Sequence, residues 1–372
     1  MANIPLFHCA ISDEIIAKAT SVMQSGQLAA GPHVAALEEE ISAFMGGLPA
    51  VAMGDMTHAL TVALQLAGVG SGDDVMTLSY NCMSSNGAIS AAGAVPVWID
   101  IDPRSASFSP ADAAKALTPR TKAVVVYHVA GYPANLTAIR RFCDEQGLPL
   151  IEDANNALGA TFDGAPVGTI GDFAVFSFYA NRQINAIDGA ILVTRNPEHA
   201  AEARKLRRFG IDVARFRDAN GEINPETDIP VIGTSSPLTN FNAILAREGL
   251  VTLSARVNRN RENVRQLEEA ISGLEGIRSI QAIPGAQPCY WVWLVCADDR
   301  DKLLKDLKTA GIGCSKLHQP NHIYTGFQPS ARSLPETERF MKNVLAIPCG
   351  WWLDYQAITR IAETVRKSLS GS

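Results

Sequence analysis

The stretch TKAVVVYHVAGYPANLTAIRRFCDEQGLPLIEDA, residues 121–154, decides the fold class. It begins with an apolar run typical of a buried strand and ends with a second one, LPLIEDA. Between them, NLTAIRRFCDEQ has the apolar spacing of an amphipathic helix, and Gly147 is a typical residue to end it. A buried strand, a helix and another buried strand predict a parallel pair, because the helix returns the chain to the starting edge.

The same alternation extends along the chain from residue 50 to residue 195. Helix-like THALTVALQLAGV (57–69) and SSNGAISAAGA (84–94) alternate with strand-like DDVMTLSY (73–80) and VPVWIDID (95–102). The pattern predicts an α/β fold with a parallel sheet covered by helices on both faces. Ligands bind such sheets beyond the carboxyl ends of the strands. The candidate site residues therefore follow the apolar runs: Tyr80 to Cys82, His128, Asp153 to Asn156, and Ser177 to Arg182.

After residue 240 the pattern changes. NAILAREGLVTLSARVNRNRENVRQLEEAISGL (242–274) is one long helical pattern rich in Arg and Glu. Beyond it, β-like CYWVWLVCA stands among helical segments, which is typical of a small α+β domain. We predict a large domain over residues 1–245 and a small C-terminal domain over residues 246–372, since 372 residues suit two domains.

Composition and charge disfavour several kinds of partner. The net charge is −6 and there is no basic run, which argues against nucleic acid and anionic membranes. No apolar stretch is long enough to span a bilayer, and the N-terminus lacks the pattern of a secretion signal. The seven cysteines are scattered without a C-x-x-C pair, which indicates reduced thiols in a cytoplasmic protein and no metal site.

Several stretches, in order and over nearly the whole chain, resemble the DegT/StrS (DegT/DnrJ/StrS) sugar aminotransferase family. They are GQLAAGPHVAALEEEISAFMG (26–46), AGAVPVWIDIDP (92–103), the region 128–160, GTIGDFAVFSFYANRQINAIDGAILVT (168–194) and IPCGWWLD (347–354). The resemblance implies fold type I of the pyridoxal 5′-phosphate (PLP) enzymes, the aspartate aminotransferase superfamily. It also implies a mostly parallel seven-stranded sheet between helices, a small C-terminal α+β domain, a homodimer and a nucleotide-linked keto-sugar substrate.

The resemblance further implies a site for PLP or pyridoxamine phosphate (PMP), and some matching residues are present. Asp153 matches the carboxylate that keeps the pyridine nitrogen protonated, and Asn156 matches a position near the ring oxygen. Thr57 and Ser177 match two hydroxyls that contact the phosphate. His128 matches a family histidine, to which we assign a catalytic role.

Other matching positions depart from the family pattern. Met56 stands where a glycine lets the backbone approach the phosphate closely. Cys82 stands where an aromatic ring covers the pyridine face, with Tyr80 nearby. Ser235 stands for an asparagine that reaches a phosphate across the dimer interface. By the same resemblance, Asn321 and His322 are expected near the substrate entrance.

Arg182 aligns with the lysine that forms the Schiff base in this family. A lysine amine can lose its charge when it is desolvated, and the neutral amine then attacks the aldehyde. A guanidinium has a pKa above about 12 and forms no stable imine. Arg182 is therefore unable to do the covalent work of that lysine, although its fork can hold a carboxylate or phosphate.

Three functions remain open on the sequence alone. The first is a divergent, aminotransferase-like protein, or a lysine-independent lyase or dehydratase, that uses noncovalent PLP or PMP on a keto-sugar-like carbonyl substrate. The second is a cofactor-free family member reused for other chemistry or for binding. The third is a sugar aminotransferase carrying a Lys-to-Arg substitution that traps an intermediate. All three predict a homodimer with a small-molecule ligand.

Overall fold

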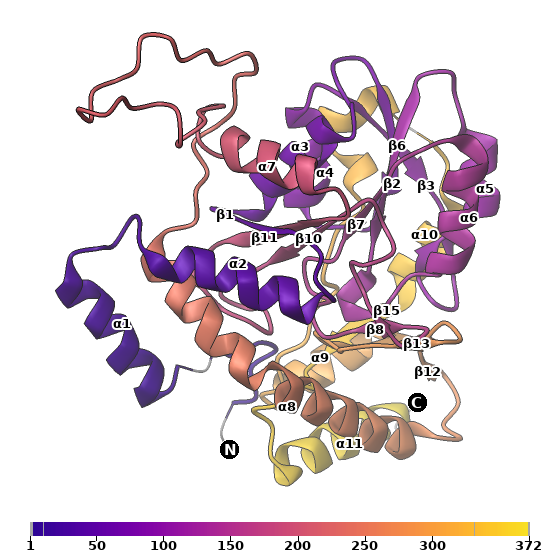
Figure 1. The fold of residues 1–372 in the computed structure, drawn as a ribbon. Coiled ribbons are helices and arrows are strands. Elements are labelled where there is room, and N and C mark those ends of the chain that lie inside the picture. The colour runs from indigo at the N-terminus through magenta and orange to yellow at the C-terminus, as the bar shows by residue number, and fades with distance from the viewer. Residues whose placement is uncertain (1–2, 10, 331, 371–372) are drawn as a thin grey trace.

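The central sheet confirms the α/β prediction. The structure is a computed structural model that describes residues 3–9, 11–330 and 332–370. Figure 1 shows the sheet at the centre of the molecule with helices on both faces. In the described part of the chain its strand order is β1-β11-β10-β7-β6-β2-β3. The bounds are β1 Ala50–Met53, β2 Asp74–Leu78, β3 Val95–Ile99, β6 Thr121–Tyr127, β7 Leu150–Asp153, β10 Phe173–Ser177 and β11 Ala190–Thr194.

The sheet is mostly parallel, as expected from the continuous apolar runs. Strand β11 pairs antiparallel with β1 and β10, and the other neighbours pair parallel. Strands β2, β7, β10 and β11 are buried along their whole length. A sheet covered on both faces needs apolar side chains on both, which explains why these strands show no alternation of polar and apolar residues.

Helices cover the two faces of the sheet. One face packs against α3 Met56–Leu66, α4 Met83–Ala91 and α7 Pro197–Leu206. The other packs against α2 Pro32–Phe44, α5 Pro110–Ala116, α6 Leu136–Gln146 and the first part of α8 Asn240–Ile271. The helix between the two buried strands is α6, which begins after Asn135 and ends at Gly147 with a φ of 64°. Gly147 has a left-handed backbone conformation, which glycine adopts without strain.

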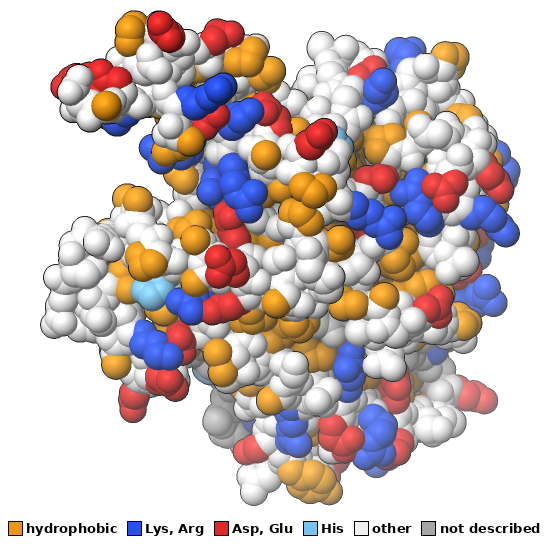
Figure 2. All heavy atoms as spheres, viewed as in Figure 1, with side chains coloured by type: hydrophobic (Ala, Val, Ile, Leu, Met, Phe, Trp, Pro, Cys, Tyr) orange, Lys and Arg blue, Asp and Glu red, His pale blue; other side chains and the backbone are white. Residues whose placement is uncertain are grey.

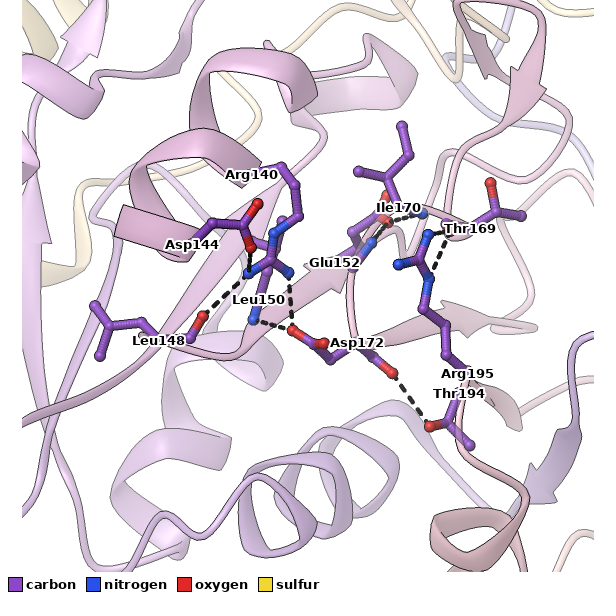
Figure 3. A network of polar contacts seen from close by, with 11 residues as sticks. Arg140, Asp144, Leu148, Leu150, Glu152, Thr169, Ile170, Asp172, Thr194 and Arg195 are labelled. Carbon is purple, nitrogen blue, oxygen red and sulfur yellow. Dashed lines mark hydrogen bonds and ion pairs between the residues drawn. The ribbon is translucent and has the colours of Figure 1, made fainter. Parts of the chain in front are cut away.

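A polar network fixes the amino ends of β7 and β10. Figure 3 shows Arg140 of α6 pointing toward Asp172. The Asp172 carboxylate accepts hydrogen bonds from Arg140 Nη1 at 2.9 Å and from the backbone nitrogen of Leu150 at 2.8 Å. These contacts join α6 to the amino ends of both strands, and Asp153 and Ser177 stand at the carboxyl ends of the same strands.

The C-terminal part contains a second, smaller sheet. It is antiparallel and consists of β12 Ile277–Ser279, β14 Trp293–Ala297 and β15 Val344–Ile347. It packs with α9 Arg300–Thr309, α10 Pro335–Asn343 and α11 Tyr355–Ser370. Short strands complete the chain: β4 Ile101–Asp102 with β5 Ser107–Phe108, and β8 Thr161–Phe162 with β9 Ala165–Pro166 and β13 Ala286–Gln287. Helix α8 contacts both α2 and α11, so the domain division at residue 245, inside this helix, remains a proposal.

Two segments project from the body of the molecule. They are α1 Asp13–Ser25 and the loop at residues 208–236, which lies at the upper left of Figure 1. Figure 2 shows hydrophobic side chains on the surface of the loop. Exposed apolar residues on the two segments include Ile16, Met23, Phe209, Val213 and Ile232. Of the described helices, none is both long enough and apolar enough to cross a membrane.

Candidate functional site

A cavity of about 490 Å³ lies at the predicted edge of the sheet. Three segments that follow sheet strands line it: the start of α3 after β1, the start of α4 after β2, and the loop after β10. The C-terminal part adds Trp291 and the segment 315–318, and Phe7 comes from the N-terminal segment. Five predicted site residues line this cavity: Met56, Thr57, Cys82, Ser177 and Arg182. Asp153 and Asn156 are not among its lining residues; Asp153 is linked to them through Asn81, which precedes Cys82 and donates to the Asp153 carboxylate.

Arg182 lines the cavity as a stacked cation. Its Cζ lies 4.6 Å from the centre of the Trp291 ring, and its Nη1 donates to Asn181 Oδ1 at 2.6 Å. Trp291 is held by its own hydrogen bond to Asn181 O at 2.6 Å and by stacking on Phe7 at 4.5 Å. Arg182 Nε is buried and has no partner among the described residues. Burial lowers the pKa of Arg182, but an arginine starts high enough to stay charged at pH 7.

Asp153 is a fully buried carboxylate at the end of β7. Its Oδ2 accepts from Asn81 Nδ2 at 2.9 Å, and its Oδ1 accepts from Asn155 Nδ2 at 2.9 Å. Asn156, the neighbouring predicted residue, donates from Nδ2 to the Tyr127 hydroxyl at 3.0 Å. Its Oδ1 is buried without a partner in the described part of the chain. A carboxylate held by two neutral amides keeps its charge available to a cation placed beside it.

The N-terminus of α3 faces the same cavity but is capped by a carboxylate. Asp55 is the N-cap: its Oδ1 accepts from the backbone nitrogen of His58 at 2.9 Å. Its Oδ2 lies 2.6 Å from His58 Nδ1 and 3.4 Å from the Ser236 hydroxyl. Asp55, Met56 and Thr57 all line the cavity. The carboxylate thus occupies the place where a helix N-terminus binds an external anion.

His318 is a cavity residue that the sequence argument missed. It lies on the segment between Ser315 and Asn321, and its Nε2 is 3.4 Å from the Tyr127 hydroxyl. Burial first, and then the Arg182 cation, lowers the pKa of His318 to about 4. The imidazole is therefore neutral at pH 7, and can accept or donate a hydrogen bond inside the cavity. Its one signal in the sequence was its position three residues before Asn321, which was expected near the substrate entrance.

The structure places His128 outside the cavity. Its Nδ1 accepts from the backbone nitrogen of Ala134 at 3.0 Å, so the proton is on Nε2, which lies 3.0 Å from Glu152 Oε2. Burial raises the pKa of Glu152, but hydrogen bonds from His128 and from the Gly171 and Gly168 backbone outweigh it and leave the pKa lowered. Both side chains are fully buried. We therefore propose a structural role for His128 in place of the catalytic one.

Four other predicted residues also lie outside the cavity lining. Tyr80 is buried and donates to the carbonyl of Lys316 at 3.2 Å. Asn321 accepts from Asn86 Nδ2 at 2.8 Å, and His322 Nδ1 lies 2.6 Å from the Ser79 hydroxyl. These three hold the segment that carries His318. The fourth is Ser235, which is exposed and forms a backbone bridge with Arg208.

The lining contains no lysine among the described residues. Lys316 comes nearest in the chain, because it stands between the lining residues Ser315 and Leu317. Its Nζ, however, forms an ion pair with Asp301 Oδ1 at 3.0 Å. The cation at the cavity wall is therefore the guanidinium of Arg182.

Comparison with known proteins gives consistent matches. The model of the DegT/DnrJ/EryC1/StrS aminotransferase family matches residues 9–366. The dTDP-3-amino-3,4,6-trideoxy-alpha-D-glucose transaminase of Streptomyces venezuelae is 32% identical over 351 residues, 93% of this chain and 89% of that protein. The solved structure of the aminotransferase TlmJ from Streptoalloteichus hindustanus has a TM-score of 0.92 and 30% identity, covering 100% of both chains. Spr1654 from Streptococcus pneumoniae, solved in PLP and PMP forms, has a TM-score of 0.91 at 21% identity, and the PLP form covers 100% of this chain and 99% of its own.

Proposed function

Because this chain belongs to the DegT/DnrJ/EryC1/StrS aminotransferase family, a family of PLP-dependent nucleotide-sugar transferases, we propose a specific departure from its chemistry. The cavity binds a small carbonyl compound of the nucleotide-linked keto-sugar type, without the lysine-dependent transfer of an amino group. One observation carries this proposal. A guanidinium stacked on Trp291 stands at the cavity wall, and no lysine is among the described lining residues.

The residues in and next to the cavity fit PLP only in part. Asp153 suits a protonated pyridine nitrogen, because it is a buried carboxylate held by neutral amides. The PLP aldehyde has no partner for a Schiff base among the described lining residues, since Arg182 forms no stable imine. The face of the ring meets Cys82, whose thiol offers little contact area. At the phosphate end, Met56 brings a side chain and Asp55 a negative charge. The lining therefore favours a cofactor-free family member reused for binding or for other chemistry.

Arg182 supplies the main recognition group in this proposal. Its Nε has no partner in the described part of the chain, and its Nη1 donates to the neutral oxygen of Asn181. Among the described residues, no carboxylate therefore lies at hydrogen-bond distance from the guanidinium. A carboxylate or a phosphate of the ligand would be held by the planar fork, and the contact with the Trp291 ring positions the guanidinium in advance.

Noncovalent binding of PLP or PMP is the second candidate. It is favoured by Asp153 and by the buried Asn156 Oδ1, which lacks a partner among the described residues. Thr57 and Ser177 would supply hydroxyls to the phosphate, as both line the cavity. When bound, the cofactor would supply an electron sink for a carbonyl or amine substrate.

An absorption spectrum with added PLP, followed by borohydride treatment, separates these functions. We expect that borohydride attaches no PLP covalently to residues of the cavity, and mass spectrometry of peptides measures this. A PLP absorption band that appears on mixing and is removed by dialysis would favour the second candidate, provided that borohydride fixes no PLP to the cavity. A trapping substitution predicts that Arg182→Lys alone restores a reducible aldimine and amination of a keto sugar. We expect that it does not, because Met56, Cys82 and Asp55 remain.

We also propose that the protein is a cytoplasmic homodimer. Support for the dimer comes from the exposed apolar side chains of α1 and of the loop 208–236, among them Met23, Phe209 and Ile232. Ser235, at the end of that loop, is exposed and available to a second copy. Support for the cytoplasm comes from the cysteines, which are all free. Light scattering on the wild type and on Ile232→Asp measures the oligomeric state, and a monomeric wild type contradicts the dimer.

A further inference from the structure

We propose that the Asp55 carboxylate excludes phosphate monoesters from the α3 end of the cavity, and so determines which ligands this site accepts. The ligand group that lies there is uncharged or cationic. This inference rests on the proposed use of the cavity as the ligand site, but not on the role of Arg182.

The position of Asp55 is fixed from two sides. Its Oδ1 accepts from the backbone nitrogen of His58 at 2.9 Å, which is the N-cap hydrogen bond of α3. Its Oδ2 lies 2.6 Å from the His58 ring and 3.4 Å from the Ser236 hydroxyl. Ser236 is itself held, because its hydroxyl accepts from the backbone nitrogen of Gly54 at 3.2 Å. A carboxylate with these contacts has little freedom to move aside for a ligand.

The helix end that would attract a phosphate is thus already used by an anion of the chain. Backbone N–H groups and the helix dipole favour one negative charge at this place, and Asp55 supplies it. A phosphate dianion brought to the same end would meet a fixed negative charge at short range in a partly buried site. Asp188 also lines the cavity and adds a second carboxylate. Met56 adds a side chain to the same wall.

The test compares PMP with pyridoxamine, two ligands that differ only in the phosphate and lack an aldehyde that would react with surface lysines. Their dissociation constants are measured by calorimetry for the wild type and for Asp55→Asn. Asparagine caps helices as well as aspartate does, so this variant removes the charge and keeps the cap. Asp299→Asn is the matched control, because Asp299 caps α9 through Lys302 N at 3.0 Å, away from the cavity.

We expect Asp55→Asn to bind PMP at least about tenfold more tightly than the wild type does, with pyridoxamine changed by less than about threefold. Asp299→Asn should match the wild type with both ligands. Equal PMP affinity in the wild type and Asp55→Asn overturns the proposal, and so does an absence of PMP binding to both. Preference of the wild type for PMP over pyridoxamine also overturns it. None of these outcomes involves borohydride, so failure here is distinguishable from failure of the proposed function.

Discussion

Lowering the pH from 7 to 5 should destabilise the protein through His318, by an amount that follows from its surroundings. Burial and then the Arg182 cation lower the pKa of His318 to about 4, whereas the pKa in an unfolded chain is about 6.5. Between these values the unfolded chain binds a proton that the folded chain does not. The free energy of unfolding therefore falls as the pH drops. Proton linkage with these two pKa values gives a loss of about 2 kcal/mol, an upper value because the ring borders the cavity.

The assay is urea unfolding at pH 7 and pH 5, for the wild type and for His318→Gln. The variant lacks the titrating ring, so its loss of stability between the two pH values should be smaller by up to about 2 kcal/mol. Other groups titrate equally in both proteins and cancel in the difference. In a second variant, Arg182→Gln, the pKa of His318 should rise but stay below its ordinary value, because burial is the larger cause. NMR titration of the imidazole measures that shift directly.

Two results would refute this reasoning. The first is the same loss of stability in the wild type and in His318→Gln, which would mean that the ring is not desolvated. The second is an unchanged pKa of His318 in Arg182→Gln. In that case the guanidinium is not beside the imidazole, and the description of the cavity wall is wrong.

Two further predictions concern residues that hold the site in place. Glu152→Gln should lower the free energy of unfolding by about 3 kcal/mol, because it removes a buried charge that accepts from His128 and from backbone donors. The control Glu275→Gln, at an exposed position, should have little effect. Denaturant unfolding measures the stability of both variants. Gly131→Ala should cost more than Gly147→Ala, although both glycines have positive φ, because a Cβ at Gly131 would lie 3.0 Å from Trp291 N and one at Gly147 meets nothing within 4 Å. Equal thermal stability of the two alanine variants would contradict the second prediction.

The fold was predictable because its signals are local. The apolar runs of β6 and β7 and the amphipathic pattern of α6 lie within one stretch of the chain, and Gly147 marks the end of the helix. The rule that ligands bind at the carboxyl ends of parallel strands then placed Ser177 and Arg182 at the cavity. These inferences need only neighbouring residues and general packing rules.

The other wall of the cavity was not predictable in the same way. Phe7, Trp291 and His318 come from the N-terminal segment and from the C-terminal part, and no periodicity relates them to the strands. The same limit explains Asn321, which was expected at the substrate entrance. Its amide is buried and joins Asn86 to the carbonyl of Asn81, a use that only the packed structure reveals.

The residues around Arg182 argue that the cavity is adapted to a permanent cation. A flat guanidinium gains more than an ammonium from stacking on the Trp291 indole, and the hydrogen bond from Trp291 Nε1 to Asn181 O keeps the indole in place. Asn181 also accepts from Arg182 Nη1, and His318 stays neutral beside the cation. A single laboratory change of a lysine would leave its surroundings suited to an amine and a phosphate. Here the carboxylate of Asp55 lines the same cavity at the start of α3, where the lysine-dependent enzymes of the family hold a phosphate by the resemblance described above, so we infer natural divergence.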